Sequence, residues 1–227
     1  KCRQLSKRRR IIVLREKAST MIFYLLVLAS FTDKFPVATA ARNPSGEIRI
    51  DSEPTYFDYQ DIIKAFNRTG KQWLYGANFE DSYTKKYKCV KFKKDEVSDD
   101  EIDFTAFYTE ESKTELTQLF GKLSTEPSSD HTKSRSRHNA ITVRTQKGGT
   151  GGTLFRLVYS NYKNCSVLRM PSHDGQQGCI VLLTATALHT GLPRFCKTMY
   201  ENACGTEPAF KKLFNDSCPI ASDPPGC

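Results

Sequence analysis

The sequence contains almost nothing that points to a metal site or a catalytic centre. No Cys-x-x-Cys pair occurs, and the histidines (His131, His138, His173 and His189) lack the short spacings of zinc ligands. Neither Gly-x-Ser-x-Gly nor His-Glu-x-x-His is present. The glycines of residues 146–152 precede no Gly-Lys-Ser/Thr, so they predict a flexible hairpin connection and not a phosphate-binding loop. We therefore expect no enzyme, no metal and no cofactor.

An apolar run long enough to span a membrane is also missing. The stretch Met21–Phe31 has eleven residues, whereas a membrane-spanning helix needs about 20. Small residues follow at Ala38–Ala41, as at a signal-peptide cleavage site. The pattern predicts a secreted protein with no membrane partner and with its signal peptide at residues 21–41. We hypothesise that Met21 is the start and that residues 1–20 are an upstream extension; a long basic leader is the alternative.

Excess positive charge is confined to the leader. Residues 1–41 carry nine basic and two acidic side chains, and the remaining 186 residues carry 25 and 23. A nucleic-acid-binding face needs clustered basic residues on the folded domain, and this balance gives little reason to expect one. A chain of this length suits one domain with a single core. We place this domain at residues 42–218 and a tail at residues 219–227.

Helical patterns are restricted to two short segments. Asp58–Phe66 has apolar residues on one face and Asp58 as its N-cap, and Pro193–Ala203 begins with a proline suited to a first turn. Between them, polar turns separate short strand-like runs. One of these runs, Glu115–Leu123, is ambiguous between strand and helix. The runs are Lys71–Phe79, Tyr87–Phe92, Ile102–Tyr108, Glu115–Leu123, Ile141–Thr145, Thr153–Tyr159, Ser166–Met170 and Cys179–Thr186.

The strand pattern predicts an all-β fold with two short helices. About eight strands favour an up-and-down antiparallel barrel, which leaves room for one small ligand. A two-sheet sandwich has the same periodicity and stays open as the alternative. Within Lys71–Phe79, alternation puts the aromatic residues Trp73, Tyr75 and Phe79 on one face together with Ala77.

Six cysteines downstream of the leader predict a disulfide framework, because thiols pair in the secretory compartment. They are Cys89, Cys165, Cys179, Cys196, Cys204 and Cys218. Their spacing alone leaves fifteen connectivities open. Cys2 lies upstream of the leader, and Cys227 is left without a predicted partner. Sequons at Asn67, Asn164 and Asn215 predict N-glycosylation, most strongly at Asn67.

A series of short motifs follows the order and spacing of one known family. The motifs are Gly70–Trp73, Tyr87–Val90, Tyr159–Cys165, Pro171, Gly178–Cys179, Pro193–Cys196 and Tyr200–Cys204. Together they resemble the tick salivary lipocalins, the histamine-binding protein family. The resemblance implies an eight-stranded antiparallel lipocalin barrel with an N-terminal helix and a disulfide-tethered C-terminal helix. It also implies the pairs Cys89–Cys218, Cys165–Cys196 and Cys179–Cys204.

The resemblance implies a ligand site inside the barrel, but the matched positions differ from those of the amine binders. Those proteins place an acid directly after the cysteine that matches Cys165, and Glu-Leu-Trp after the position that matches Cys179. This chain has Ser166 and Ile180–Leu182 there, so the acids of the amine site are largely missing. The candidate ligand-binding residues are Trp73, Tyr75, Phe79, Glu80, Asp81, Phe155, Ile180 and Leu182.

Some of these candidates have a plainer alternative. Trp73 is expected either to contact the ligand or to pack the floor of the barrel. Glu80 and Asp81 bring negative charge near the barrel mouth or belong to an exposed turn. Tyr75 and Phe155 could face either the interior or the outside, and a shift of one residue in strand register would turn Phe155 from one to the other.

The resemblance implies a secreted salivary glycoprotein that sequesters small host mediators and so suppresses inflammation and host defence. Histamine or another biogenic amine is the family's default ligand, and aromatic faces add cation–π attraction. The apolar matched positions favour instead a lipid such as a leukotriene or a fatty acid, provided that Arg156 or Lys91 reaches its carboxylate. A host complement or clotting protein is a further candidate partner, suggested by Cys227 and by the hydrophilic segment Ser124–Asn139, which is predicted to be a solvated loop.

Overall fold

The computed structural model describes residues 50–67, 71–79, 82–173, 176–206 and 208–220. The predicted upstream extension and signal peptide lie outside these ranges, as does the tail beyond residue 220. Within them, eight antiparallel strands form a closed barrel, because β1 pairs with β8 on one side and with β2 on the other. The barrel prediction is therefore confirmed, and the sandwich alternative is wrong.

Each strand of the barrel pairs with its neighbours in the sequence. The strands are β1 (Lys71–Ala77), β2 (Lys88–Val97), β3 (Glu101–Glu110), β4 (Lys113–Ser124), β5 (Ala140–Arg144), β6 (Thr153–Ser160), β7 (Cys165–His173) and β8 (Gln176–Thr184). The segment that was ambiguous in the sequence is part of β4. A short ninth strand, β9 (Lys211–Lys212), pairs with the last two residues of β1 and was not predicted.

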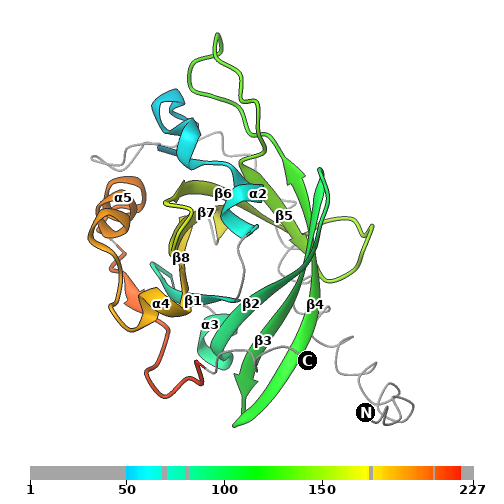
Figure 1. Cartoon of the computed structure of the whole chain (residues 1–227), viewed down its shortest axis with the longest axis vertical. Helices are drawn as coiled ribbons and strands as arrows, with labels where there is room; N and C mark the ends of the chain where they lie inside the picture. Colours follow the sequence, from blue (N-terminus) through cyan, green and yellow to red (C-terminus); the bar gives the residue numbers. More distant parts are fainter. Residues whose placement is uncertain (1–49, 68–70, 80–81, 174–175, 207, 221–227) are drawn as a thin grey trace, which may run out of the picture. The chain divides into compact units, whose positions relative to one another are not determined.

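Short helices lie at both ends of the barrel and on its outside (Figure 1). α2 (Ile62–Phe66) precedes β1 and lies at the end where β1 begins, which we call the α2 end. α3 (Ser82–Lys86) joins β1 to β2 at the opposite end, the α3 end. α4 (Ala185–Leu188) and α5 (Arg194–Cys204) follow β8 on the outside. In the described ranges, no helix is both long enough and apolar enough to cross a membrane.

The predicted N-terminal helix is divided in two. A 3-10 helix, η2, covers Pro54–Tyr59, and α2 begins only at Ile62, with Asp61 as its N-cap. The Asp61 carboxylate accepts a hydrogen bond from a backbone amide of the first turn at 2.9 Å. The break falls at Gln60, whose buried side chain donates to two backbone carbonyls. The prediction of Asp58 as N-cap is therefore wrong, because these hydrogen bonds hold the chain out of a continuous helix.

Three disulfides attach the C-terminal segment to the barrel, and they are the pairs that the resemblance implies: Cys89–Cys218, Cys165–Cys196 and Cys179–Cys204. As predicted, α5 begins after Pro193 and ends before Gly205. Its two cysteines bond to β7 and β8 and hold the helix against the outer face of the wall. Each bridge contributes roughly 2–4 kcal/mol by restricting the unfolded chain.

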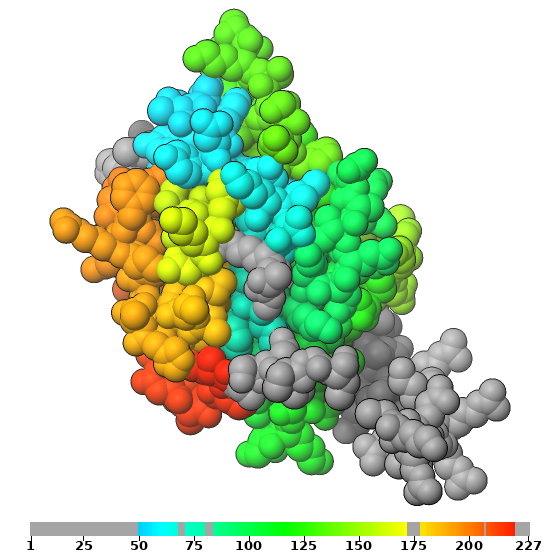
Figure 2. Space-filling view, in the orientation of Figure 1, coloured from blue at the N-terminus to red at the C-terminus, as the bar shows by residue number. Residues whose placement is uncertain are grey.

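An apolar layer fills the space between the barrel wall and the helices outside it. We call it the outer layer and define it by α4, α5 and the wall residues that pack under them. Buried members from the wall include Val167, Val181 and Leu183, and α5 contributes Met199 and Tyr200. In Figure 2 the orange helix α5, the adjoining yellow strands and the red C-terminal segment form one continuous surface on this side.

A buried ion pair fastens the start of the domain to the outer layer. Arg169 in β7 is 1% exposed and Asp51 in η1 (Ile50–Ser52) is 4% exposed. The Arg169 Nη2 lies 3.4 Å from the Asp51 Oδ1, and it also donates to the Ala203 carbonyl in the last turn of α5. One arginine therefore joins the N-terminal segment, the barrel wall and α5. A buried charge that loses its partner is strongly destabilising, so each member depends on the other.

The segment Ser124–Asn139 forms a loop, but its middle is held against the N-terminal segment. Arg135 donates to the Gln60 side chain and to the Asp51 carbonyl. Its guanidinium lies 3.8 Å from the centre of the Phe57 ring. Burial lowers the pKa of Arg135 to about 10, so the group stays cationic at neutral pH. The segment is thus a loop with mostly exposed residues, as predicted, and Arg135 anchors its middle to the domain.

Replacing Asp51 by alanine tests the buried ion pair. The change leaves Arg169 buried without its carboxylate, so we expect the free energy of unfolding to fall by about 3–5 kcal/mol. Urea denaturation followed by far-UV circular dichroism measures the loss. Asp99→Ala removes an exposed carboxylate and should change the stability by less than about 0.5 kcal/mol. Equal effects of the two variants would contradict the assigned role of Asp51.

Candidate ligand-binding site

The disulfides determine which strand residues face the barrel interior. Cys165 and Cys179 bond to α5, which lies outside, so their side chains leave the wall outward. Successive strand residues point to opposite faces, and directly paired residues point to the same one. The pairing registers therefore carry the assignment from β7 and β8 around the whole barrel. The inward residues of β7 and β8 are Ser166, Leu168, Met170, Ile180 and Leu182.

A β-bulge in β1 separates the aromatic residues that simple alternation places together. The register of β1 with β8 shifts between Leu74 and Gly76. As a result Trp73 and Tyr75 face the outer layer, where they are 3% and 8% exposed, while Phe79 faces the interior. The prediction of one aromatic face is wrong. Trp73 and Tyr75 pack outside the wall and not inside the barrel, which is the packing alternative for Trp73 and the outer alternative for Tyr75.

Gly76 is the local reason for the bulge. Its α-carbon faces Phe210, and a Cβ at this position would collide with the Phe210 ring and lie 2.5 Å from the Lys211 carbonyl oxygen. Glycine inside a strand often marks such a close approach. The segment around β9 can therefore lie flat on β1, and the Tyr75 ring stacks with Phe210 at a centroid distance of 6.1 Å.

The inward faces of β1, β7 and β8 form an apolar wall. Phe79 packs over Gly178, where an added Cβ would lie 2.9 Å from the ring and 3.2 Å from the Met170 methyl group. Phe155 of β6 also faces inward, since it lies two residues before Leu157, which pairs with the inward-facing Leu168, and pairs itself with Ile141. Of the predicted contacts, Phe79, Phe155, Ile180 and Leu182 are thus brought to the interior. The residues of the apolar wall are Leu74, Ala77, Phe79, Leu168, Met170, Ile180 and Leu182.

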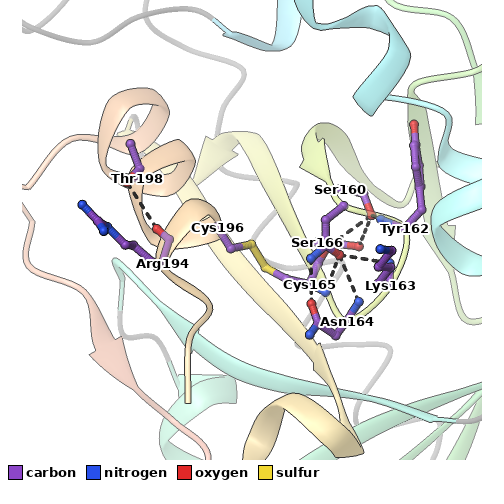
Figure 3. The surroundings of a disulfide bond; sticks show 10 residues. Ser160, Tyr162, Lys163, Asn164, Cys165, Ser166, Arg194, Cys196 and Thr198 are labelled. Carbon is purple, nitrogen blue, oxygen red and sulfur yellow. Dashed lines mark hydrogen bonds between the residues drawn. A yellow bond between two sulfur atoms is a disulfide. The ribbon is translucent and has the colours of Figure 1, made fainter. Parts of the chain in front are cut away.

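Ser166, which stands where the amine binders have an acid, is satisfied within the wall. It is 1% exposed, and its hydroxyl oxygen lies 3.0 Å from that of Ser160 (Figure 3). Ser160 also donates to the Cys165 carbonyl and accepts from the Tyr162 amide. Both hydroxyl groups are therefore engaged beside the Cys165–Cys196 disulfide and offer no charge to a ligand.

The two cations suggested for a lipid carboxylate lie on the outside of the barrel. Arg156 pairs in register with Arg169 and forms an ion pair with Glu126 of the β4–β5 loop. Lys91 pairs in register with Trp73, and its Nζ lies 5.8 Å from the centre of the Phe107 ring. Neither side chain can reach a ligand inside without leaving its strand face. The predicted anchoring role of Arg156 or Lys91 is therefore wrong.

Glu115 in β4 brings a carboxylate to the interior at the α3 end. It is paired directly with Tyr108 of β3. Glu115 lies on the same face of β4 as the inward-facing Gly121, and Tyr108 lies on the same face of β3 as Ile102. The Tyr108 ring meets the Tyr87 ring edge to face at a centroid distance of 4.5 Å, and its hydroxyl lies 3.3 Å from the Thr117 Oγ1. We call Tyr87, Tyr108, Glu115 and Thr117 the Glu115 cluster.

The Glu115 cluster has the chemistry of a cation site. The two tyrosines are buried, and Glu115 and Thr117 are half-buried. Burial raises the pKa of Tyr87, so its hydroxyl is neutral at physiological pH. Among the described residues, no hydrogen bond or ion pair engages the Glu115 carboxylate. A half-buried carboxylate on the strand position opposite an aromatic residue can hold an ammonium group by charge, and the neighbouring ring can add cation–π attraction.

The other charged residues at inward-facing strand positions either interact with residues at the ends of the barrel or are exposed. At the α2 end, the Lys94 Nζ donates to the Asn67 Oδ1 at 2.8 Å. At the α3 end, Glu110 pairs with Lys86 of α3 at 2.8 Å, and Lys113 is exposed at the tip of the β3–β4 hairpin. The described residues hold no cluster of three or more metal-binding side chains.

The remaining sequence predictions stay open. Glu80 and Asp81 lie outside the described residues. Asn67 and Asn215 are exposed, which suits N-glycosylation, while Asn164 is half-buried and accepts a hydrogen bond from the Asn161 amide at 2.7 Å.

Glu115 was missed because its segment reads equally well as a helix. The signal in the sequence is the polar run Glu110–Lys113 between two strand-like runs. In the structure this run forms a short β3–β4 turn, in which Glu111 and Ser112 both have positive φ, as in a two-residue hairpin turn. A turn of this length fixes the register of the two strands, and that register places Glu115 opposite Tyr108.

The model of the tick histamine binding protein family matches residues 50–219, most of the chain. The chain belongs to this family. Solved structures with a similar fold include AM182 in its serotonin complex, at 13% identity and a TM-score of 0.50 over 80% of this chain and 100% of that one. Japanin from Rhipicephalus appendiculatus, bound to cholesterol, is 16% identical with a TM-score of 0.47 over 68% and 97%.

LTBP1 in complex with LTC4 is 14% identical, with a TM-score of 0.44 over 78% of this chain and 99% of that one. At these identities the likeness concerns the fold alone. The comparison with curated proteins finds no match. The family match and the closed eight-stranded barrel agree with each other.

Trp73→Ala tests the outer position of the tryptophan. Loss of the indole leaves a cavity between β1 and the outer layer, so the free energy of unfolding should fall by about 3–5 kcal/mol. Urea denaturation followed by far-UV circular dichroism measures this without the tryptophan signal. Phe195→Ala is the matched control, because that ring is 61% exposed, and it should cost less than about 1 kcal/mol. A loss below 1 kcal/mol for Trp73→Ala would contradict the packing role.

Proposed function

We propose that this tick lipocalin is secreted and sequesters a small cationic host mediator, an amine with an apolar body, inside its barrel. The observation that carries the proposal is the inward-facing Glu115, which is paired across the strands with Tyr108, whose ring in turn contacts the Tyr87 ring. A buried ammonium group needs a carboxylate, because an unpaired charge away from water is too costly. Membership of the histamine binding protein family supports the same ligand class.

The apolar wall supports a ligand with a hydrophobic portion. Leu74, Ile180 and Leu182 offer no polar groups, and they lie on strands opposite β4 in the strand order. An amine bound at the Glu115 cluster would direct its ring or chain towards this wall. Serotonin and histamine, which differ in the size of the ring, are therefore suitable probes.

A lipid mediator is the second candidate, and the same apolar wall favours it. The outward position of Arg156 and Lys91 weakens it for lipids that carry a carboxylate, since neither cation is available inside. The third candidate, a host plasma protein bound through Ser124–Asn139, loses support because Arg135 ties that loop to the domain. Secretion is supported by the three disulfides, which form and persist in oxidising compartments.

Calorimetric titration of the purified protein with serotonin, histamine, leukotriene C4 and a fatty acid tests the ligand class. We expect binding of at least one amine, and a decrease in its affinity of about tenfold or more in Glu115→Gln, because the charged interaction is lost while the shape is kept. Tight leukotriene binding without amine binding would overturn the proposal.

Glu201→Gln is the matched control for the titration. It removes an exposed carboxylate from α5, where Glu201 lies 3.6 Å from Lys197, far from the barrel interior. Amine affinity should be unchanged in this variant. An equal loss in both variants would assign the effect to net charge and not to the Glu115 cluster.

A further inference from the structure

One half of β4 has a free edge. The strand pairs with β3 along its length from Lys113 to Lys122, but its pairing with β5 begins only at Phe120. β5 ends at Arg144, while β4 continues to the tip of the hairpin, which Figure 1 shows extending past its neighbours. Thr114–Leu119 therefore has no strand partner on the β5 side within the described residues. The β5–β6 loop does not replace that partner, since within the described residues no backbone hydrogen bond joins this loop to Thr114–Leu119.

This edge lacks two of the features that usually protect a free strand, proline and a β-bulge, and its protection is limited to the inward-facing charge of Glu115. Proteins block such edges with proline, bulges, strong twist or a covering segment, because unpaired backbone groups invite another strand. Thr114–Leu119 contains no proline, and its register with β3 is regular throughout. Its outward residue Leu116 is 63% exposed, the highest exposure of a large hydrophobic residue in the described part of the chain. In Figure 2 the green tip of this hairpin projects below the red C-terminal segment.

We propose that a second copy of this chain pairs with the free edge, antiparallel, with Leu116 opposite Leu116. In this register Thr114 faces Gln118 and Glu115 faces Thr117, so no two like charges meet. The two exposed leucines cover each other on the outer face, and each strand satisfies the free backbone groups of the other. The result is an isologous dimer through one continuous sheet.

Charge and apolar contact together favour this register over the two registers shifted by one residue. A pairing centred on Glu115 would place two carboxylates directly opposite each other, which is destabilising. A pairing centred on Thr117 would oppose Leu116 to Gln118 and leave both leucines without an apolar partner. The self-complementary sequence around Leu116 is the reason for choosing a second copy over a foreign strand.

Single cysteines test the register directly. The background is Cys227→Ser in a chain that starts after the predicted signal peptide, which removes both cysteines outside the three disulfides, Cys2 and Cys227. Directly opposed strand residues have α-carbons about 4.5–5.5 Å apart, within the range of a disulfide. Leu116→Cys should therefore form a disulfide-linked dimer on a non-reducing gel, whereas Thr114→Cys or Gln118→Cys alone should stay monomeric. Mixing the last two proteins should yield the linked dimer again. Equal linkage of all three single variants would overturn the register.

Sedimentation equilibrium of the Cys227→Ser protein tests the dimer itself. We expect the mass to rise towards twice the monomer value with increasing concentration. Leu116→Lys should abolish the rise, because it places two ammonium groups opposite each other. The residue is exposed, so the variant should keep the far-UV circular dichroism spectrum of the parent. A monomer mass at every concentration, or capture of a foreign protein without self-association, would overturn the proposal.

Discussion

The covalent attachment of the C-terminal segment to the outside of the barrel is the constraint on which the rest depends. Because Cys165 and Cys179 must point outward to reach α5, the residues next to them must point inward. The pairing of β7 with β8 is regular from Cys165 to Met170, so two sulfur positions fix the faces of this part of both strands. Closure of the sheet then fixes the other six strands through their registers. The two disulfides on the outside of the barrel therefore determine which residues face its interior.

The buried ion pair of Asp51 and Arg169 complements the disulfides. A charged pair this deep gains little by itself, because desolvation offsets most of the attraction. Its effect here is positional, since Arg169 also donates to the Ala203 carbonyl near the end of α5. The disulfides hold α5 against the wall in any state in which the barrel exists. The ion pair adds the N-terminal segment, which carries no cysteine within the described residues, to the same assembly.

Much of this could be predicted from the sequence, and the exceptions have local causes. The strand pattern indicated the barrel, and the family resemblance gave the disulfide pairs. Alternation failed at Tyr75 and Gly76, because a bulge changes the face of every later residue in the strand. The glycine was visible, but its meaning depended on Phe210, a residue more than a hundred positions away. Sequence periodicity reflects only nearby residues, so it cannot reveal a contact between residues as far apart in the sequence as Gly76 and Phe210.

The position of Glu115 changes what the missing acids imply. The absence of acids after Cys165 and Cys179 argues against an amine only if those strands alone supply charge to the interior. A closed barrel presents eight inward faces to one small volume, so a carboxylate on β4 can serve a ligand as well as one on β7 or β8. The attraction depends on distance and burial, and not on which strand carries the group. Loss of charge from one wall is therefore compatible with the amine site that we propose at the other, with Ser166 and Ile180 then contributing shape instead of charge.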